Sequence, residues 1–159
     1  MKKQVLAVCL MIFMTFFGCA VEEDPFLLLR GSYAAEVEGM LHEVAFAAKI
    51  ERACSEDGAL LTVTFYAPDA LRDTKLIQEK EGTVSLCYDR VRVVTDQGMW
   101  HDLLCLFDAE GHVTDIFLNE EGRSVIVGED FSIELLSGGI PYHVQRGNVQ
   151  ARVIAFEKR

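Results

Sequence analysis

Four histidines and three pairs of adjacent acidic residues are the side chains best suited to metal or acid–base chemistry in this sequence. The histidines are His42, His101, His112 and His143. No two of them stand four residues apart, as in the HExxH zinc motif, so the spacing predicts no metal site. The acidic pairs fall in expected turns, where solvated charge is a simpler interpretation than a general acid and base. They are Glu56-Asp57, Glu120-Glu121 and Glu129-Asp130. With no Gly-x-Ser-x-Gly elbow or phosphate loop, we expect no catalytic residue, no cofactor and no enzymatic activity.

Cys19 is the residue whose position indicates a covalent modification. It follows two lysines near the N-terminus and an almost unbroken apolar run from Val5 to Phe17. This order is typical of a secretory signal peptide. A membrane-spanning helix needs about 20 apolar residues, so the run is too short to be a permanent anchor. We expect residues 1–18 to be a signal peptide.

The pair Gly18-Cys19 resembles the lipobox of bacterial lipoproteins. In that family the cysteine sulfur receives a diacylglyceryl group and the chain is cut just before it. The resemblance therefore implies a palmitate-type lipid anchor on Cys19 and a location on the extracytoplasmic face of a bacterial cell membrane. Two acyl chains would hold the protein there, because one chain alone binds only reversibly. The alternative is an ordinary secreted protein cut near Gly18.

The charge balance limits the possible partners. The chain has 159 residues, with 25 acidic and 15 basic side chains and a net charge of −10. Nucleic-acid binding requires clustered basic residues, so this balance argues against it. Loss of residues 1–18 would leave 141 residues and, without Lys2 and Lys3, a net charge of −12. Because such a body is repelled by anionic lipid, the acyl group must provide the anchoring.

Three cysteines remain in the body of the protein: Cys54, Cys87 and Cys105. Their odd number and the absence of a CxxC motif argue against a disulfide framework or a structural zinc site. A single bridge between Cys54 and Cys87 remains open, but the expected strand phases place these two side chains on opposite faces of the sheet.

The body of the protein, residues 32–159, has the alternation of antiparallel strands. A lipidated tether over residues 19–31 precedes it, with a short helix that ends at Gly31. Turn signals then recur every 8 to 12 residues, as in an antiparallel sheet. The first hairpin is expected to turn between Gly39 and His42. Apolar runs predict strands over 33–37, 44–50, 61–66, 75–80, 84–88, 91–93, 113–118, 124–127, 131–135, 140–144 and 149–153.

One central stretch, Met99–Asp108, has helical spacing instead. Its apolar side chains fall on a single stripe, formed by Trp100, Leu103, Leu104 and Phe107. Cys105 points away from the stripe and should be partly covered, and Asp102 should be a favourable first-turn carboxylate. The expected fold is mainly β (α+β): a curved antiparallel half-barrel of about ten strands, with this helix packed on its concave apolar face.

The strand pattern resembles the LolA/LppX-like lipoproteins, most closely the small envelope lipoproteins of Gram-positive clostridia. Three segments carry the likeness: Tyr33–Val37, Val63–Pro68, and the hairpin of Phe131–Leu135 with Gly139-Ile140-Pro141. The resemblance implies an open half-barrel lined with apolar side chains. Members of the family carry lipidated proteins or glycolipids, sense the state of the envelope or bind a partner protein. One clostridial branch partners a wall amidase in spore germination.

Two functions remain. The first is a membrane-anchored module that binds a lipid or other apolar ligand between the helix and the sheet, with candidate contacts Val63, Phe65, Trp100, Leu104 and Phe117. A single tryptophan on an amphipathic helix is usually a core residue, which is the alternative interpretation of Trp100. The second is an interaction scaffold that recruits an envelope protein, such as a wall enzyme, through an exposed strand edge. Val149–Phe156 is the candidate edge strand, because Arg152 and the terminal Lys158-Arg159 resemble charges that guard an open ladder. The volume of the cavity under the helix should distinguish the two functions.

Overall fold

The computed structural model of the protein describes residues 26–56, 58–79, 81–108 and 113–159. The signal peptide, Cys19, Asp57 and His112 lie outside these ranges, so the predictions that concern them stay predictions. No helix within the described ranges is long and apolar enough to cross a membrane.

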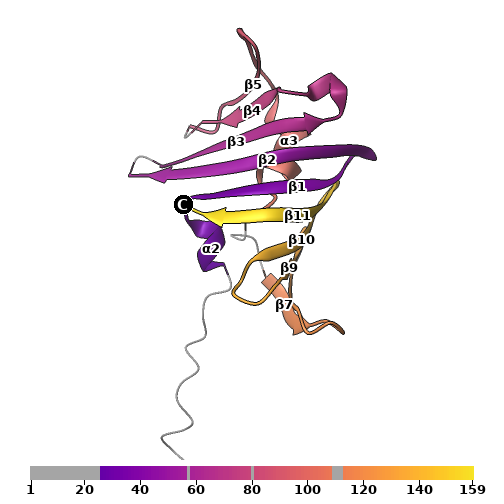
Figure 1. Ribbon diagram of the computed structural model, residues 1–159. Coiled ribbons are helices and arrows are strands. Elements are labelled where there is room, and N and C mark those ends of the chain that lie inside the picture. The colour runs from indigo at the N-terminus through magenta and orange to yellow at the C-terminus, as the bar shows by residue number, and fades with distance from the viewer. Residues whose placement is uncertain (1–25, 57, 80, 109–112) are drawn as a thin grey trace, which may run out of the picture.

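The described chain forms an open antiparallel sheet of eleven strands with a helix on one face (Figure 1). The helices are α2 (Leu27–Arg30), the 3-10 helix η1 (Asp69–Leu71) and α3 (Gln97–Leu104). The strands are β1 (Tyr33–Leu41), β2 (Val44–Ser55), β3 (Gly58–Ala67), β4 (Lys75–Gln78), β5 (Val84–Tyr88), β6 (Val91–Val94), β7 (Val113–Leu118), β8 (Ser124–Gly128), β9 (Phe131–Leu135), β10 (Pro141–Arg146) and β11 (Val149–Lys158). The fold class expected from the sequence is confirmed, and every apolar run predicted as a strand forms one.

Two meanders make up the sheet. Strands β1 to β6 follow one another across one half and β7 to β11 across the other, and antiparallel pairing of β1 with β11 joins the halves. The free edges are therefore β6 and β7. The prediction that Val149–Phe156 is an edge strand is wrong, because Arg152 is paired with Glu38 of β1 on one side and with His143 of β10 on the other. The charge of Arg152 marks the solvated outer face of the sheet rather than its edge.

The first hairpin turns later than expected. Its two turn residues, His42 and Glu43, have positive φ angles of 46° and 68°, as two-residue hairpin turns with the right-handed twist of the strands require. Gly39 lies inside β1 instead. A Cβ atom there would lie 2.0 Å from the carbonyl oxygen of Gln150, so only glycine lets β11 approach this closely.

Helix α3 covers the concave face of the sheet. The Asp96 side chain caps it by accepting a hydrogen bond from the backbone N–H of Gly98 at 2.9 Å. The helix therefore begins two residues before the predicted Met99 and ends at Leu104. All four members of the predicted stripe are buried, although Phe107 lies in the turn after the helix. Asp102 consequently falls in the second turn, so the prediction of a first-turn carboxylate is wrong.

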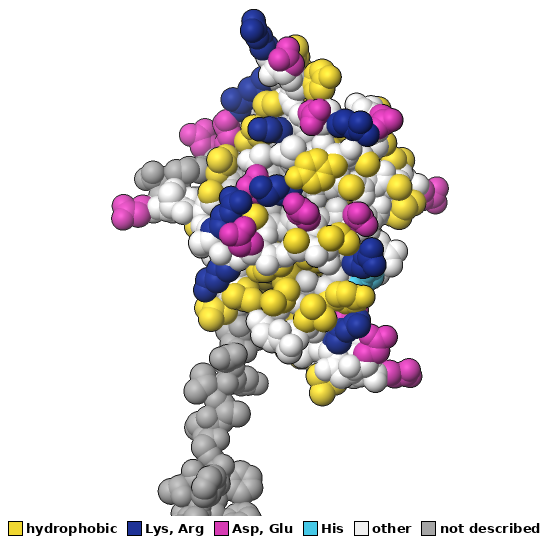
Figure 2. All heavy atoms as spheres, in the orientation of Figure 1, with side chains coloured by type: hydrophobic (Ala, Val, Ile, Leu, Met, Phe, Trp, Pro, Cys, Tyr) yellow, Lys and Arg dark blue, Asp and Glu magenta, His cyan; other side chains and the backbone are white. Residues whose placement is uncertain are grey.

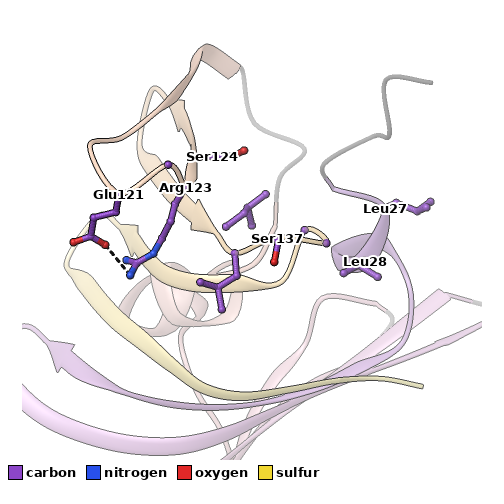
Figure 3. A pocket seen from close by; sticks show the side chains of 11 residues that line it. Leu27, Leu28, Glu121, Arg123, Ser124 and Ser137 are labelled. Carbon is purple, nitrogen blue, oxygen red and sulfur yellow. Dashed lines mark ion pairs between the residues drawn. The ribbon is translucent and has the colours of Figure 1, made fainter. Parts of the chain in front are cut away.

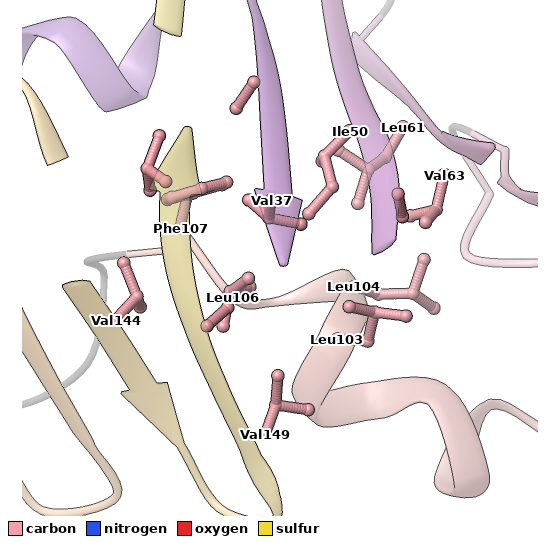
Figure 4. Packing of buried hydrophobic residues seen from close by; sticks show 14 of the residues in the cluster. Val37, Ile50, Leu61, Val63, Leu103, Leu104, Leu106, Phe107, Val144 and Val149 are labelled. Carbon is pink, nitrogen blue, oxygen red and sulfur yellow. The ribbon is translucent and has the colours of Figure 1, made fainter. Parts of the chain in front are cut away.

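The concave interior is packed with apolar side chains. Leu106, which the helical stripe did not include, is fully buried beside Phe107. In Figure 4, side chains from α3 and the turn after it point toward Val37, Ile50 and Val63 on the sheet. The opposite face, turned toward the viewer in Figure 2, carries charges of both signs among scattered apolar side chains. The two faces thus divide into a core side and a solvated side.

Helix α2 closes one end of the half-barrel. It ends at Gly31, as predicted, and its Leu29 is buried in the core. The C-terminus lies beside it (Figure 1), where the backbone N–H of Arg159 donates to the carbonyl of Ser32 at 2.9 Å. We call this end, with α2 and the turns at residues 119–123 and 136–140, the tether end.

Candidate binding surfaces

Four of the five expected ligand contacts meet in the concave interior. Val63 and Phe65 of β3 are completely buried, and Trp100 and Leu104 of α3 lie over the sheet. The rings of Phe65 and Trp100 are 5.9 Å apart between centroids. These residues contact each other, however, and so behave as a core.

Phe117 does not join them. In the β7–β8 pairing, Ile116 is opposite the buried Ile126, so Phe117 faces the other side of the sheet, with 45% of its side chain exposed. The sequence could not establish this phase, because Ile116 and Phe117 are both apolar and alternation alone favours neither.

The described residues leave a small cavity under the helix. A cavity of about 150 Å³ lies where the end of α3 meets the sheet, and Arg52, Gln78 and Asp108 contribute polar groups to its lining. Pockets that hold small ligands ordinarily measure about 300–1,000 Å³ and are mostly apolar. The interior formed by the described residues is thus too small and too polar there for an acyl chain.

A buried arginine, Arg146, lies beside the turn that follows α3. Arg146 of β10 is 5% exposed, and its guanidinium lies 4.8 Å from the ring centroid of Phe131. One of its N–H groups donates to the backbone carbonyl of Asp108, in the turn after α3. This contact ties the end of the helical segment to the sheet. The predicted strand ends at Val144, before Arg146, although Arg146 follows the buried Val144 by two residues and so shares its inward phase.

Cys105 and His101 are neighbours on one turn of the helical segment, with 3.7 Å between Sγ and Nδ1. A cysteine beside a histidine can be a nucleophile when its thiolate is stabilised. Here burial, and next the carboxylate of Asp108, raise the pKa of the Cys105 thiol, while Arg146 opposes them. The environment therefore favours the neutral thiol, which is a poor nucleophile. Cys105 is partly covered, as predicted.

The other candidate groups are dispersed. The described residues contain no cluster of histidine, cysteine and acidic side chains that could hold a metal ion. Glu120-Glu121 and Glu129-Asp130 lie in turns, as predicted. Cys54 and Cys87 are free thiols. The registers place Cys54 in the row of Ile50 on the concave side and Cys87 opposite Arg92 on the other side, so the prediction that they lie on opposite faces is confirmed.

A larger pocket of about 660 Å³ opens at the tether end (Figure 3). Leu27 and Leu28 of α2 form one wall, and Leu135 and Leu136 contribute apolar surface from the β9 side. Arg123 lies at its rim and is held by ion pairs to Glu121 at 2.7 Å and Glu134 at 2.8 Å. No sequence pattern predicts this pocket, because it forms where α2 meets turns that are distant in the sequence.

Exposed apolar side chains also gather at the two free edges of the sheet. Strand β6 has no buried residue, and Val91, Val93 and Val94 are 61%, 55% and 69% exposed. At the other edge the exposed apolar residues of β7 are Ile116, Phe117 and Leu118. Contiguous exposed apolar surface often marks a site of protein–protein contact.

Comparison with known proteins supports the fold and does not identify a family. No family model matches the chain, and no curated protein matches it significantly. An uncharacterized conserved protein from Thermus thermophilus has a similar structure, with 16% identity and a TM-score of 0.55 over 83% of this chain and 81% of that one. MucB is similar over 89% of this chain but 60% of its own length, with 11% identity and a TM-score of 0.50. A domain of an outer membrane lipoprotein-sorting protein from Vibrio parahaemolyticus has 10% identity and a TM-score of 0.46, covering 80% of this chain and 85% of that one. The likeness to the first two structures concerns the fold alone at these identities, and it is consistent with the half-barrel that the resemblance implied.

Proposed function

We propose that this protein is an interaction scaffold of the cell envelope, anchored to the membrane through a lipidated Cys19, whose half-barrel binds another envelope protein at its outer surface. The observation that carries the proposal is the filled interior. Among the described residues, the cavity under α3 measures about 150 Å³ and has polar groups in its lining. Val63, Phe65, Trp100 and Leu104 are therefore assigned to the core rather than to a ligand.

The remaining features agree with a binding role. The sheet ends in two free edges, and β6 exposes three valines. The thiol of Cys105, which lies beside His101, has a raised pKa and is therefore mostly neutral. We propose a binding role, without catalysis, for the protein itself. An enzyme of the cell wall is the class of partner that the resemblance to clostridial lipoproteins implies.

Crosslinking in intact cells tests this function. The full-length protein is treated with a lysine-reactive crosslinker and purified under denaturing conditions. We expect one specific second polypeptide, recovered in proportion to the scaffold. The matched control joins residues 1–25 to an unrelated soluble domain and should not capture that polypeptide, although it carries the same anchor. Recovery of the uncrosslinked chain alone would contradict the proposal.

The tether-end pocket favours a second candidate function, the binding of an acyl chain. Its volume of about 660 Å³ falls within the usual range for ligands, and four leucines line it. Seven residue steps separate Cys19 from Phe26, and each spans at most about 3.6 Å, so α2 would lie within about 25 Å of a lipidated cysteine. The pocket would then stand close to the membrane that supplies its ligand.

Lipid extraction distinguishes this second candidate. Leu136→Gln alters the lining of the pocket, whereas Leu118→Gln changes an exposed leucine of β7 that does not line it. If the pocket binds an acyl chain, noncovalently bound lipid should be extracted with the wild-type protein and the Leu118 variant. The Leu136 variant should lose this bound lipid. Equal lipid content in all three proteins would exclude a specific site in this pocket.

A further inference from the structure

Strand β6 presents a backbone ladder that no further strand of the described residues pairs with. It forms one edge of the sheet and pairs only with β5 among the described strands. The backbone N–H of Thr95 donates to the carbonyl of Val84 at 3.0 Å. Because successive residues of an antiparallel strand alternate in direction, the backbone groups of Val91 and Val93 also face β5. Those of Arg92 and Val94 therefore point away from the sheet, toward a position where a further strand would lie.

The concave side of this edge is apolar and uncovered. Val93 is opposite Leu86, which is in turn opposite the fully buried Leu76, so Val93 lies in the same row as the core. Val91 and Tyr88 form the next pair of this face and are 61% and 59% exposed. The apolar layer thus continues past the part that α3 covers. Exposed strands of this kind readily pair with another chain, and proteins usually protect them.

The charges at this edge differ from those of the whole protein. Arg90 and Arg92 stand in or next to β6, and Asp89 and Asp96 flank this stretch at its two ends. On the outer face, the row that crosses Arg92 also contains Lys75 of β4. One acidic group, that of Glu79, is paired with Arg92. The outer row at this edge therefore carries two cations, Lys75 and Arg92, against the one carboxylate that is paired with Arg92.

We propose that β6 binds an extended segment of a partner protein as a twelfth strand. The segment would place apolar side chains against Val91 and Val93 on the concave side and an acidic side chain beside Arg92 on the outer side. Main-chain hydrogen bonds would provide affinity, and the alternating side chains would provide specificity. This inference depends on the proposed scaffold function, because it names the site at which the partner binds.

A proline at position 94 tests the docking site without removing the hydrogen bonds that hold β6 to β5. Val94→Pro removes an N–H that points away from the sheet and leaves those of Val91, Val93 and Thr95, which face β5. Proline is tolerated at an edge when the lost N–H faces solvent. The matched control is Val94→Thr, which keeps the N–H. A second pair, Arg92→Glu and Arg92→Lys, tests the charge with no change to the backbone. Unchanged circular dichroism and thermal melting will show that each variant folds.

The experiment uses the full-length, membrane-anchored protein in cells, with a photo-crosslinking amino acid at Val91. Two control positions are Ile116 on the opposite edge and Ile154 in the central strand β11, both about half exposed. We expect crosslinks from position 91 to one extended segment of a second protein. Their yield should fall at least about tenfold in Val94→Pro and in Arg92→Glu, since the loss of about 1.4 kcal/mol of binding energy lowers affinity tenfold. Val94→Thr and Arg92→Lys should retain it.

Every other result decides against the inference. A partner that crosslinks only from Ile116 or Ile154 would overturn edge pairing at β6 and leave the scaffold function standing. A second copy of this chain, or a yield that Val94→Pro does not change while the variant is folded, would also overturn it. No crosslink to another protein from any of the three positions would overturn both the inference and the scaffold function.

Discussion

The carboxylate of Asp102, on α3, accepts a hydrogen bond from the backbone N–H of Asn148, in the turn between β10 and β11, at 2.9 Å. This bond joins the helix to a strand pair 46 residues away in sequence. Gly147, beside Asn148, has a φ of +47°, and a Cβ on it would lie 2.4 Å from the Asp102 carboxylate. Glycine is therefore required at position 147 for both its backbone conformation and the space it leaves.

Substitution of Gly147 tests this contact. Gly147→Ala should destabilise the protein by about 1–2 kcal/mol from the left-handed backbone alone, and by more because the new methyl group displaces Asp102 from Asn148. In an Asp102→Ala background the second effect disappears, so the same substitution should cost less. Urea denaturation gives the free energy of unfolding of all four proteins: the wild type, the two single variants and the double variant. Equal costs in the two backgrounds would show that Asp102 and Gly147 do not interact.

Tyr33 should make the protein sensitive to alkaline pH. Burial raises the pKa of its hydroxyl well above the usual value near 10, although the charge of Arg52 opposes this shift. The unfolded chain ionises first as pH rises, so stability is complete below about pH 10 and is lost between the unfolded and folded pKa values. Tyr33→Phe removes the ionisation and should flatten the decline of unfolding free energy above pH 10. Tyr66→Phe, at an exposed position of β3, is the control and should follow the wild-type curve.

Trp100 should contribute to stability through its apolar surface rather than through hydrogen bonding. It is 8% exposed, and its indole N–H has no hydrogen-bond partner among the described residues. Trp100→Ala should cost about 3–5 kcal/mol, whereas Trp100→Phe keeps a ring against Phe65 and should cost less than about 2 kcal/mol. Circular dichroism during urea unfolding suits both variants, because each removes the only tryptophan. If the two costs were equal, ring packing would not be the source of the stabilisation.

Cys19→Ser tests the predicted anchor. If the leader is that of a lipoprotein, the variant should fail to incorporate labelled palmitate and should leave the membrane fraction, because two acyl chains are needed for stable attachment. Cys9→Ser, inside the predicted signal peptide, is the matched control and should keep both the label and the membrane location. Persistence of the label in Cys19→Ser would show that the lipid is attached elsewhere.

Local patterns in the sequence predict the elements of this fold better than their arrangement. Alternation places each strand, and the spacing of Trp100, Leu103 and Leu104 places the helix, because both patterns reflect burial on one face. The alternation of apolar and polar residues is the same for a central strand as for an edge strand. It could therefore not show that β11 lies in the middle of the sheet and β6 at its edge. The size of the interior was equally out of reach, since it depends on Leu106 and Phe107, whose side chains fill the space after the helix ends.

Native mass spectrometry of the full-length protein, extracted from its own membrane in mild detergent, can show whether the folded chain holds a polypeptide or a lipid. A scaffold with a filled interior should retain a second polypeptide on the acylated chain and no noncovalently bound lipid. A spectrum dominated by the single chain with one noncovalently bound lipid, and no polypeptide partner, would contradict the account and favour the apolar-ligand function instead.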